Sequence, residues 1–315
     1  MAGQTLLVGY RAADISPDIV QGDVTCYVLD VYDRHAIEKT HHLKAICAPS
    51  VPEGPWDVVK YRTGPKLMSG ELSLDLLQQI HLVSRKCGCR VEVDYVGRER
   101  DRNDLLDKIK DDPDRVRSFR ATWPASVPGG PKLTFASYPG CFCHRRMDEG
   151  GLALAEVVCR RMCECEPPSK PPRVLDMGCG CGLVGLLVAT RLREAGREVS
   201  LVMVDSHSRA VQAASENAES FGVPAEVILS DCGVPERMDG TFDVFVGNPP
   251  YYSDYRIADV FLETAKRALA PGGVCWTVCK NAAGLEPVQR RYFPSVETTM
   301  RRGYAVLMSG QPAKQ

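Results

Sequence analysis

The chain has 315 residues, of which 44% are hydrophobic and 25% are charged. This ordinary globular composition excludes a fibrous or wholly disordered protein. Lysine and arginine total 39 against 40 aspartate and glutamate, so the net charge of −1 excludes a polycationic domain, and any contact with nucleic acid must come from local patches.

The length predicts two domains, at roughly 150 residues for each. No apolar run approaches the ~20 residues of a membrane helix, and the first residues lack the basic and apolar segments of a secretory signal. We therefore expect a cytoplasmic protein without membrane contact. The 14 cysteines form several C-x-C pairs, which suit structural zinc poorly, so we expect reduced thiols and no metal. The alternative is a metal cluster of Cys141, Cys143, His144, Cys159, Cys163 and Cys165.

Two stretches of the chain share one order of predicted elements, namely strand, helix, glycine turn and strand. The first stretch comprises residues 55–59, 74–84 and 88–93, and the second comprises residues 241–245, 258–269 and 273–278. Both are followed by a further helix, at 101–109 and 285–291. This similarity predicts a diverged internal duplication of an α/β unit.

A segment rich in proline and glycine, residues 123–131, is the predicted linker. It divides the chain into domains at 1–125 and 132–315. After it, strands alternate with helices, which predicts a doubly wound, mostly parallel sheet. The predicted strands are 173–177, 199–204, 225–229, 242–247 and 274–278, the helices are 182–195, 208–221 and 257–269, and residues 304–308 form one more strand, placed antiparallel.

A glycine turn follows the first of these strands. The strand ends at Asp176 and Met177, and Gly178, Gly180 and Gly182 then lead directly into a helix. Glycine lets the backbone pass close to a ligand, and the helix N-terminus presents unpaired N–H groups. The turn by itself predicts a nucleotide-type cofactor and leaves a nicotinamide dinucleotide open.

The next strands also end in residues that suit a nucleoside ligand. Asp205 ends the second strand, where an acidic side chain reaches a ribose diol. Asp231 and Cys232 follow the third strand, where we expect them to meet an adenine ring. The fourth strand is followed by an Asn-Pro-Pro-Tyr turn at 248–251.

This turn offers hydrogen-bond acceptors that suit an amine or amide nitrogen of a substrate. An exocyclic amine or an amide nitrogen is a poor nucleophile because its lone pair is delocalised. The Asn248 side-chain oxygen and the Pro249 carbonyl can accept its N–H groups and favour tetrahedral geometry, while Pro250 stiffens the turn. Tyr251 offers a face for stacking. Catalysis would then rest on positioning, without a general base.

The four elements, taken in order, resemble the class I S-adenosylmethionine-dependent methyltransferases over residues 132–309. The resemblance implies S-adenosyl-L-methionine as the cofactor. The implied cofactor-binding residues are Asp148, Asp176, Gly178, Gly180, Gly182, Asp205, Ser206, Asp231, Cys232 and Asn248. The implied catalytic residues are Asn248, Pro249, Pro250 and Tyr251.

Two tandem units, of which only the second has the glycine turn, resemble the bacterial ribosomal RNA guanine-N2 methyltransferases of the small subunit. That resemblance implies two Rossmann-like domains, the N-terminal copy being degenerate and cofactor-free. Residues 138–143 and 147–152 look like that family's segment before the glycine turn, which supports the assignment of Asp148. Cys143, Met147 and Gly151 depart from its usual Ser, Leu and Ser, and Tyr251 stands where Phe is usual.

We therefore expect transfer of methyl to guanine N2 in ribosomal RNA, by a monomer whose partner is the RNA or the small ribosomal subunit. Arg145 and Arg146 are the favoured phosphate contacts. The first unit has Lys60 to Lys66 at the position of the Asn-Pro-Pro-Tyr turn, and we expect its charged residues mainly to face solvent. The alternatives are glutamine-N5 methylation of a release factor, adenine-N6 methylation of RNA, and a scaffold that no longer catalyses.

Overall fold

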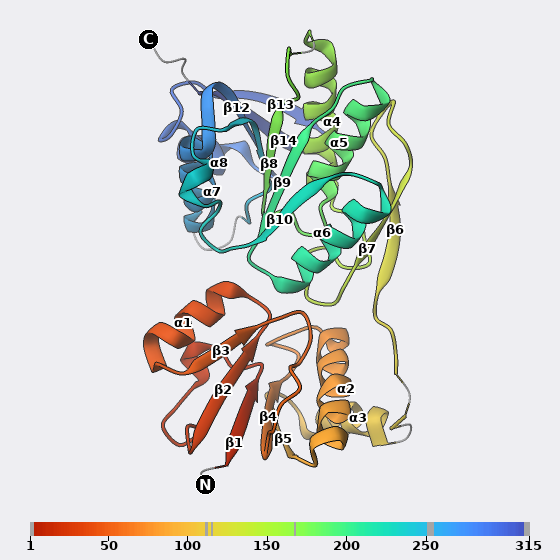
Figure 1. The fold of residues 1–315 in the computed structure, drawn as a ribbon, viewed down its shortest axis with the longest axis vertical. Coiled ribbons are helices and arrows are strands. Elements are labelled where there is room, and N and C mark those ends of the chain that lie inside the picture. Colours follow the sequence, from red (N-terminus) through yellow and green to blue (C-terminus); the bar gives the residue numbers. More distant parts are fainter. Residues whose placement is uncertain (1–2, 111–112, 115, 167, 251–254, 312–315) are drawn as a thin grey trace. The chain divides into compact units, whose positions relative to one another are not determined.

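The computed structural model describes residues 3–110, 113–114, 116–166, 168–250 and 255–311, and it contains two units, each built on its own sheet (Figure 1). The first unit contains Met1–Arg120 together with two short later segments, Tyr138–Gly140 and His207–Arg209. The second unit contains Ala121–Ser137, Cys141–Ser206 and Ala210–Gln315. Among the described residues, no helix combines the length and apolar character needed to cross a membrane.

The first unit has a five-stranded parallel sheet in the order β3-β2-β1-β4-β5. Its strands are β1 (Gln4–Val8), β2 (Asp23–Val28), β3 (Lys44–Cys47), β4 (Val58–Thr63) and β5 (Arg90–Tyr95). Its helices are η1 (Ala12–Asp14), α1 (Val31–His41), α2 (Gly70–Cys87) and α3 (Glu99–Lys110).

Helix α2 covers this sheet with one apolar face. Leu74, Leu77 and Ile80 are spaced at about one helical turn and are buried in the same cluster as Val59 and Tyr61 of β4. The burial of these side chains is the main force that holds the helix to the sheet.

The second unit has a seven-stranded sheet in the order β10-β9-β8-β11-β12-β14-β13, and a separate hairpin of β6 and β7. Its strands are β6 (Ala121–Ala125), β7 (Leu133–Ser137), β8 (Arg173–Met177), β9 (Ser200–Asp205), β10 (Ala225–Leu229), β11 (Phe242–Gly247), β12 (Leu269–Cys279), β13 (Glu297–Arg301) and β14 (Tyr304–Gly310). Its helices are α4 (Glu149–Glu164), α5 (Leu183–Glu194), α6 (Ser208–Ser220), η2 (Glu236–Met238), α7 (Arg256–Ala268) and α8 (Ala282–Arg290).

Helices cover both faces of this sheet, with α7 and α8 on one face and α4 and α5 on the other (Figure 1). In α7 the buried residues Ala258, Phe261, Leu262 and Ala265 recur at helical spacing and pack in one cluster with strand residues such as Phe245. Five neighbouring strands of this sheet, in the order β10-β9-β8-β11-β12, are parallel to one another. This confirms the predicted doubly wound sheet.

The five parallel strands β8 to β12 of the seven-stranded sheet repeat the order of the first unit's sheet. The earliest strand in the chain, β1 or β8, lies between two pairs: the next two strands along the chain lie on one side of it, and the following two lie on the other. The two stretches that resemble each other in sequence therefore occupy equivalent places, β4-α2-β5 and β11-α7-β12.

Strand β14 is antiparallel, as the sequence predicted, and it is not the outermost strand of the sheet. Strand β13 pairs with its outer edge. The sequence did not indicate β13 because its side chains are mostly exposed and polar, and so lack the alternation of a half-buried strand.

The predicted linker at 123–131 was wrong. Trp123 lies in β6 and stacks on Phe135 of β7 with ring centroids 5.2 Å apart. The proline and glycine residues form the turn of this hairpin, where Gly130 N–H donates to the Val127 carbonyl. The first unit accordingly ends at Arg120, slightly before the predicted boundary at residue 125.

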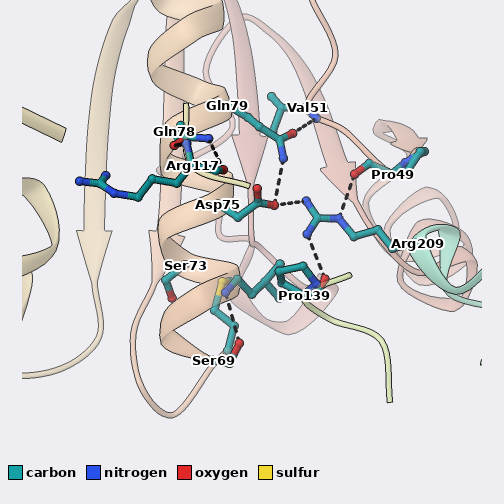
Figure 2. Close-up of polar contacts among 12 residues, drawn as sticks. Pro49, Val51, Ser69, Ser73, Asp75, Gln78, Gln79, Arg117, Pro139 and Arg209 are labelled. Carbon is teal, nitrogen blue, oxygen red and sulfur yellow. Dashed lines mark hydrogen bonds and ion pairs between the residues drawn. The ribbon is translucent and has the colours of Figure 1, made fainter. Parts of the chain in front are cut away.

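Arg209 is the most deeply buried cation of the first unit's polar network, at 3% exposure (Figure 2). Its Nη2 lies 2.6 Å from Asp75 Oδ2, and Asp75 is 15% exposed. Its Nε and Nη1 each donate at 2.9 Å, to the carbonyls of Pro49 and Pro139. Gln79 adds a further donor to Asp75 at 3.0 Å. These contacts compensate the burial of both charges.

We expect Arg209→Ala to lower the free energy of unfolding by about 3–5 kcal/mol, because Asp75 then stays buried without its cation. Urea denaturation measures this loss. The matched control is Arg85→Ala, since Arg85 and its partner Asp114 are 54% and 79% exposed and such pairs contribute at most about 1 kcal/mol. Equal losses in the two variants would contradict the role of the buried pair.

Candidate functional site

The glycine turn after β8 is held by backbone hydrogen bonds to the end of β9. The N–H groups of Gly178 and Cys179 both donate to the Val204 carbonyl, at 2.8 and 3.0 Å. The next N–H, of Gly180, donates to Asp205 Oδ2 at 2.8 Å. The turn and the aspartate predicted to bind ribose therefore form one hydrogen-bonded structure.

Two glycines of the turn have different surroundings. Both adopt the left-handed conformation, with φ of 67° at Gly178 and 57° at Gly180. A Cβ at Gly178 would lie 2.5 Å from the ring of Phe261, whereas a Cβ at Gly180 would meet nothing within 4 Å. Gly178 is thus required for packing, and Gly180 leaves open space in which a ligand can approach the backbone.

Asp176 supports the turn from beneath. It is buried at the end of β8 and accepts a hydrogen bond from Gly185 N at 2.8 Å, in the first turn of α5. Burial raises the pKa of Asp176 to about 7. Its hydrogen bond joins the end of β8 to the first turn of α5.

Asn217 of α6 is an anchor that the sequence analysis missed. Its Nδ2 donates to the carbonyls of Cys181 at 2.9 Å and Ala136 at 3.0 Å, and its Oδ1 accepts from Ala136 N at 2.8 Å. A lone asparagine within an amphipathic helix gives no sequence signal for this role, because its partners lie far away along the chain.

The other predicted residues gather at the same edge of the sheet. Asp205 ends β9 and Ser206 follows it, while Asp231 and Cys232 follow β10. The two strand ends are tied by the Ser230 N–H, which donates to the Asp205 carbonyl at 3.0 Å. Parallel neighbours bring their carboxyl ends together, so the spacing along the chain correctly predicted this gathering.

Asn248 follows β11 at this edge, and its side chain is half-buried. Its Nδ2 donates to Asp148 Oδ2 at 2.7 Å. Pro249 is buried and Pro250 is half-buried, while Tyr251 lies outside the described residues.

Asp148 is the N-cap of α4. Its Oδ1 accepts from Gly150 N at 3.0 Å and its Oδ2 accepts from Gly151 N at 2.9 Å. Burial raises the pKa of Asp148, and the hydrogen bonds from Gly151 and Asn248 partly oppose that rise. The sequence placed Asp148 near the cofactor but gave no sign of its contact with Asn248.

The segment before Asp148 carries an exposed aromatic side chain. Phe142 is 65% exposed, and Cys143 and Arg145 beside it have left-handed φ values of 53° and 68°. An exposed ring can stack on a nucleic-acid base, a role that the sequence analysis did not assign to Phe142. Arg145 and Arg146, the predicted phosphate contacts, are exposed on the same segment.

Several arginines of the first unit bind carboxylates, as expected for a charged face. Arg62 pairs with Asp94 and Asp14, and Arg98 pairs with Asp101. Such pairing leaves these side chains less suited to bind phosphate.

The cysteines are free thiols. Among the residues that the structure describes, no group of three or more His, Cys, Asp or Glu side chains is arranged to hold a metal ion. Burial raises the pKa of Cys181, and likewise of Cys179, above that of an ordinary thiol, so both stay protonated beside the glycine turn.

A cavity of about 570 Å³ lies elsewhere, near the amino ends of the strands, where Pro172, Val244 and Trp276 line it. None of the predicted site residues borders it. The chemistry-bearing residues are all at the opposite edge, and we place the functional site there.

The fold and this edge together define a class I methyltransferase architecture, with a glycine turn after the central strand and an Asn-Pro-Pro turn after the neighbouring strand. Residues 132–308 match the family model of the methyltransferase small domain. The chain belongs to this family.

Several curated relatives are named as ribosomal RNA methyltransferases. Ribosomal RNA small subunit methyltransferase C of Pseudoalteromonas translucida is 30% identical over 183 residues, which cover 56% of this chain and 50% of that protein. The protein of the same name from Alcanivorax borkumensis is 31% identical, over 55% of this chain and 52% of its own length. The chain thus aligns with about half the length of these relatives.

One solved structure matches nearly the whole chain. It is the T. thermophilus 16S rRNA N2 methyltransferase RsmC in complex with AdoMet and guanosine, which aligns with a TM-score of 0.76 at 19% identity and covers 98% of this chain and 88% of its own. At that identity the match establishes the fold, two methyltransferase-like domains in tandem.

We expect Gly178→Ala to lower the free energy of unfolding by about 1–3 kcal/mol more than Gly180→Ala, because only the first methyl group overlaps a buried ring. The two variants carry similar backbone strain, so each is the control for the other. Urea denaturation of both measures the difference, and equal stability would show that Phe261 moves aside without cost.

Proposed function

We propose that this protein is an S-adenosylmethionine-dependent methyltransferase that transfers a methyl group to the exocyclic N2 amine of a guanine in ribosomal RNA. The observation that carries this proposal is the Asn248 turn beside the glycine turn, with the Asn248 amide nitrogen bound to Asp148. The names of the curated relatives and of the solved structure support the RNA substrate.

The residues of the glycine-turn edge fit the cofactor. Asp205 would bind the ribose hydroxyls, with Ser206 beside it, and Asp231 and Cys232 would border the adenine. The space above Gly180 admits a ligand against the backbone. Bound there, S-adenosylmethionine supplies an electrophilic methyl group.

The Asn248 turn would prepare the nitrogen that receives the methyl group. Because the Asn248 Nδ2 is bound to a carboxylate, its Oδ1 is left to accept an N–H of the target amine. The Pro249 carbonyl would accept the other N–H. Tyr251 and the exposed Phe142 are the aromatic side chains proposed to stack on the base.

The first unit is proposed to be a diverged copy that no longer binds cofactor and helps to hold the RNA. After β1 it has one glycine, Gly9, whose Cβ position lies 2.2 Å from the Arg62 carbonyl oxygen, so its backbone packs closely against β4. After β4 it has Gly64 where the second unit has Asn248, so no side-chain amide is present.

Two other acceptors suit the same turn, the glutamine N5 of a release factor and the N6 of adenine in RNA. The first unit argues against the release-factor reading, because enzymes of that type usually carry a small helical N-terminal domain and this unit has a five-stranded sheet. We further propose that the protein acts in the cytoplasm as a monomer on the RNA or the small ribosomal subunit.

Transfer of radiolabelled methyl from S-adenosylmethionine tests the proposal. Purified small subunits, naked ribosomal RNA and release factor are assayed in parallel, and labelled RNA is digested to nucleosides. We expect label in N2-methylguanosine. Label in release factor or in N6-methyladenosine would overturn the proposed substrate, and no transfer to any of them would overturn the proposed activity.

We expect Asp205→Ala to weaken S-adenosylmethionine binding by roughly 1–3 kcal/mol, because the ribose loses hydrogen bonds to a charged group and Gly180 N loses its acceptor. Isothermal titration calorimetry measures the affinity. Glu226→Ala is the control, since Glu226 pairs with Arg237 on the exposed side of β10. An unchanged isotherm for Asp205→Ala would refute the ribose role.

We expect Asn248→Ala to reduce turnover by at least about 100-fold while leaving cofactor affinity within about twofold, since the side chain serves the methyl acceptor. The radiometric assay gives kcat, and calorimetry gives the affinity. Parallel losses in both measurements would show that Asn248 belongs to the cofactor site instead.

A further inference from the structure

Asp148 and Asn248 are in contact although they lie 100 residues apart in the chain. Asp148 accepts three hydrogen bonds, from the backbone N–H groups of Gly150 and Gly151 and from the Asn248 side chain at 2.7 Å. The contact lies wholly within the second unit.

The N-cap hydrogen bonds hold the Asp148 carboxylate in place independently of its contact with Asn248. Both oxygens are held by the first turn of α4, so the Asp148 side chain has little rotational freedom. The turn is tight, since a Cβ at Gly151 would lie 2.7 Å from Asp148 Oδ2. Gly151, which lacks a Cβ, therefore leaves room for the carboxylate.

The chemical types of the two side chains determine the direction of their contact. An ionised carboxylate only accepts hydrogen bonds, whereas a side-chain amide donates at one end and accepts at the other. Asn248 must therefore present its NH₂ group to Asp148, and its oxygen points away. Without such a partner the terminal torsion of asparagine has a broad, roughly two-fold preference, and the two ends exchange places.

We propose that Asp148 is a positioning residue that fixes the amide orientation of Asn248, so that the oxygen of Asn248 rather than its NH₂ group faces the methyl-accepting amine. The catalytic consequence rests on the proposed function, but the orientation itself does not. This role replaces the direct cofactor contact that the sequence predicted for Asp148.

The reversed amide would oppose the reaction. Its NH₂ group would face the N–H groups of the target amine, donor against donor, and no acceptor would draw the nitrogen toward tetrahedral geometry. A loss of Asp148 should therefore lower kcat more than it changes the binding of the cofactor.

Asp148→Asn is the most informative variant, because asparagine caps helices about as well as aspartate and so keeps α4 in place. Its amide can donate to Asn248 as well as accept, so the Asn248 orientation is no longer determined. Asp148→Ser is the second variant, since serine also caps a helix but is too short to keep the contact. Glu149→Gln is the control, because the neighbouring Glu149 pairs with Arg302 and not with Asn248.

The first measurement does not depend on activity. Two-dimensional ¹⁵N–¹H spectra report the side-chain NH₂ of Asn248, identified by the pair of signals that Asn248→Ala removes. We expect Asp148→Asn and Asp148→Ser to shift this pair and Glu149→Gln to leave it in place. An Asn248 pair that is identical in the wild type and both Asp148 variants would overturn the proposal, whatever the substrate of the enzyme.

The second measurement is kinetic and uses the substrate that the methyl-transfer assay identifies. We expect Asp148→Asn and Asp148→Ser to lower kcat about tenfold or more, with the cofactor Kd changed less than about twofold. Adding Asp148→Asn to Asn248→Ala should cause no further loss, because the residue acts through Asn248. A tenfold rise in the cofactor Kd with unchanged kcat would overturn the proposal in favour of a direct cofactor contact.

Discussion

The hydrogen bonds between the glycine turn and the end of β9 are the constraint on which the site depends. Two turn N–H groups share the Val204 carbonyl, and a third is bound by Asp205. These bonds determine where the turn ends and therefore where α5 begins. They also place the carboxylate of Asp205 beside the open space at Gly180. One local structure therefore shapes the proposed cofactor site and supplies the carboxylate proposed to bind the ribose.

The side of the site proposed to hold the methyl acceptor depends on a second anchor, the N-cap of α4. The capping carboxylate of Asp148 is held by two backbone N–H groups and in turn holds Asn248. Capping is normally a matter of helix stability. Here the same hydrogen-bonding group also orients a side chain at the end of β11, so the stability of α4 and the geometry proposed for catalysis are linked.

The two units share one strand order but differ in the residues that follow their strands. The first unit repeats the strand order of the second, yet it packs Gly9 against the backbone of Arg62 and has Gly64 in the place of Asn248. The buried residues of β4 and α2 still form a continuous core. The core residues of each unit maintain its sheet, and on the proposed function the loops at the carboxyl ends of the strands distinguish the catalytic unit from the other.

The sequence by itself determined the helices and strands that carry a periodic hydrophobic pattern. It also determined the order in which the candidate site residues follow those strands. Strands β8, β10 and β11 were predicted correctly, because buried strands and glycine turns leave strong local signals. Parallel strands bring their carboxyl ends together, so the residues that follow these strands lie at one edge of the sheet. The Trp123 hairpin and strand β13 were missed, since the first depends on stacking with Phe135 and the second has little buried surface. Only the tertiary structure brought Asp148 to Asn248, Asn217 to the glycine turn, and Arg209 to Asp75. Each of these contacts joins groups far apart in the chain, and no local pattern records which distant partner satisfies a buried polar side chain.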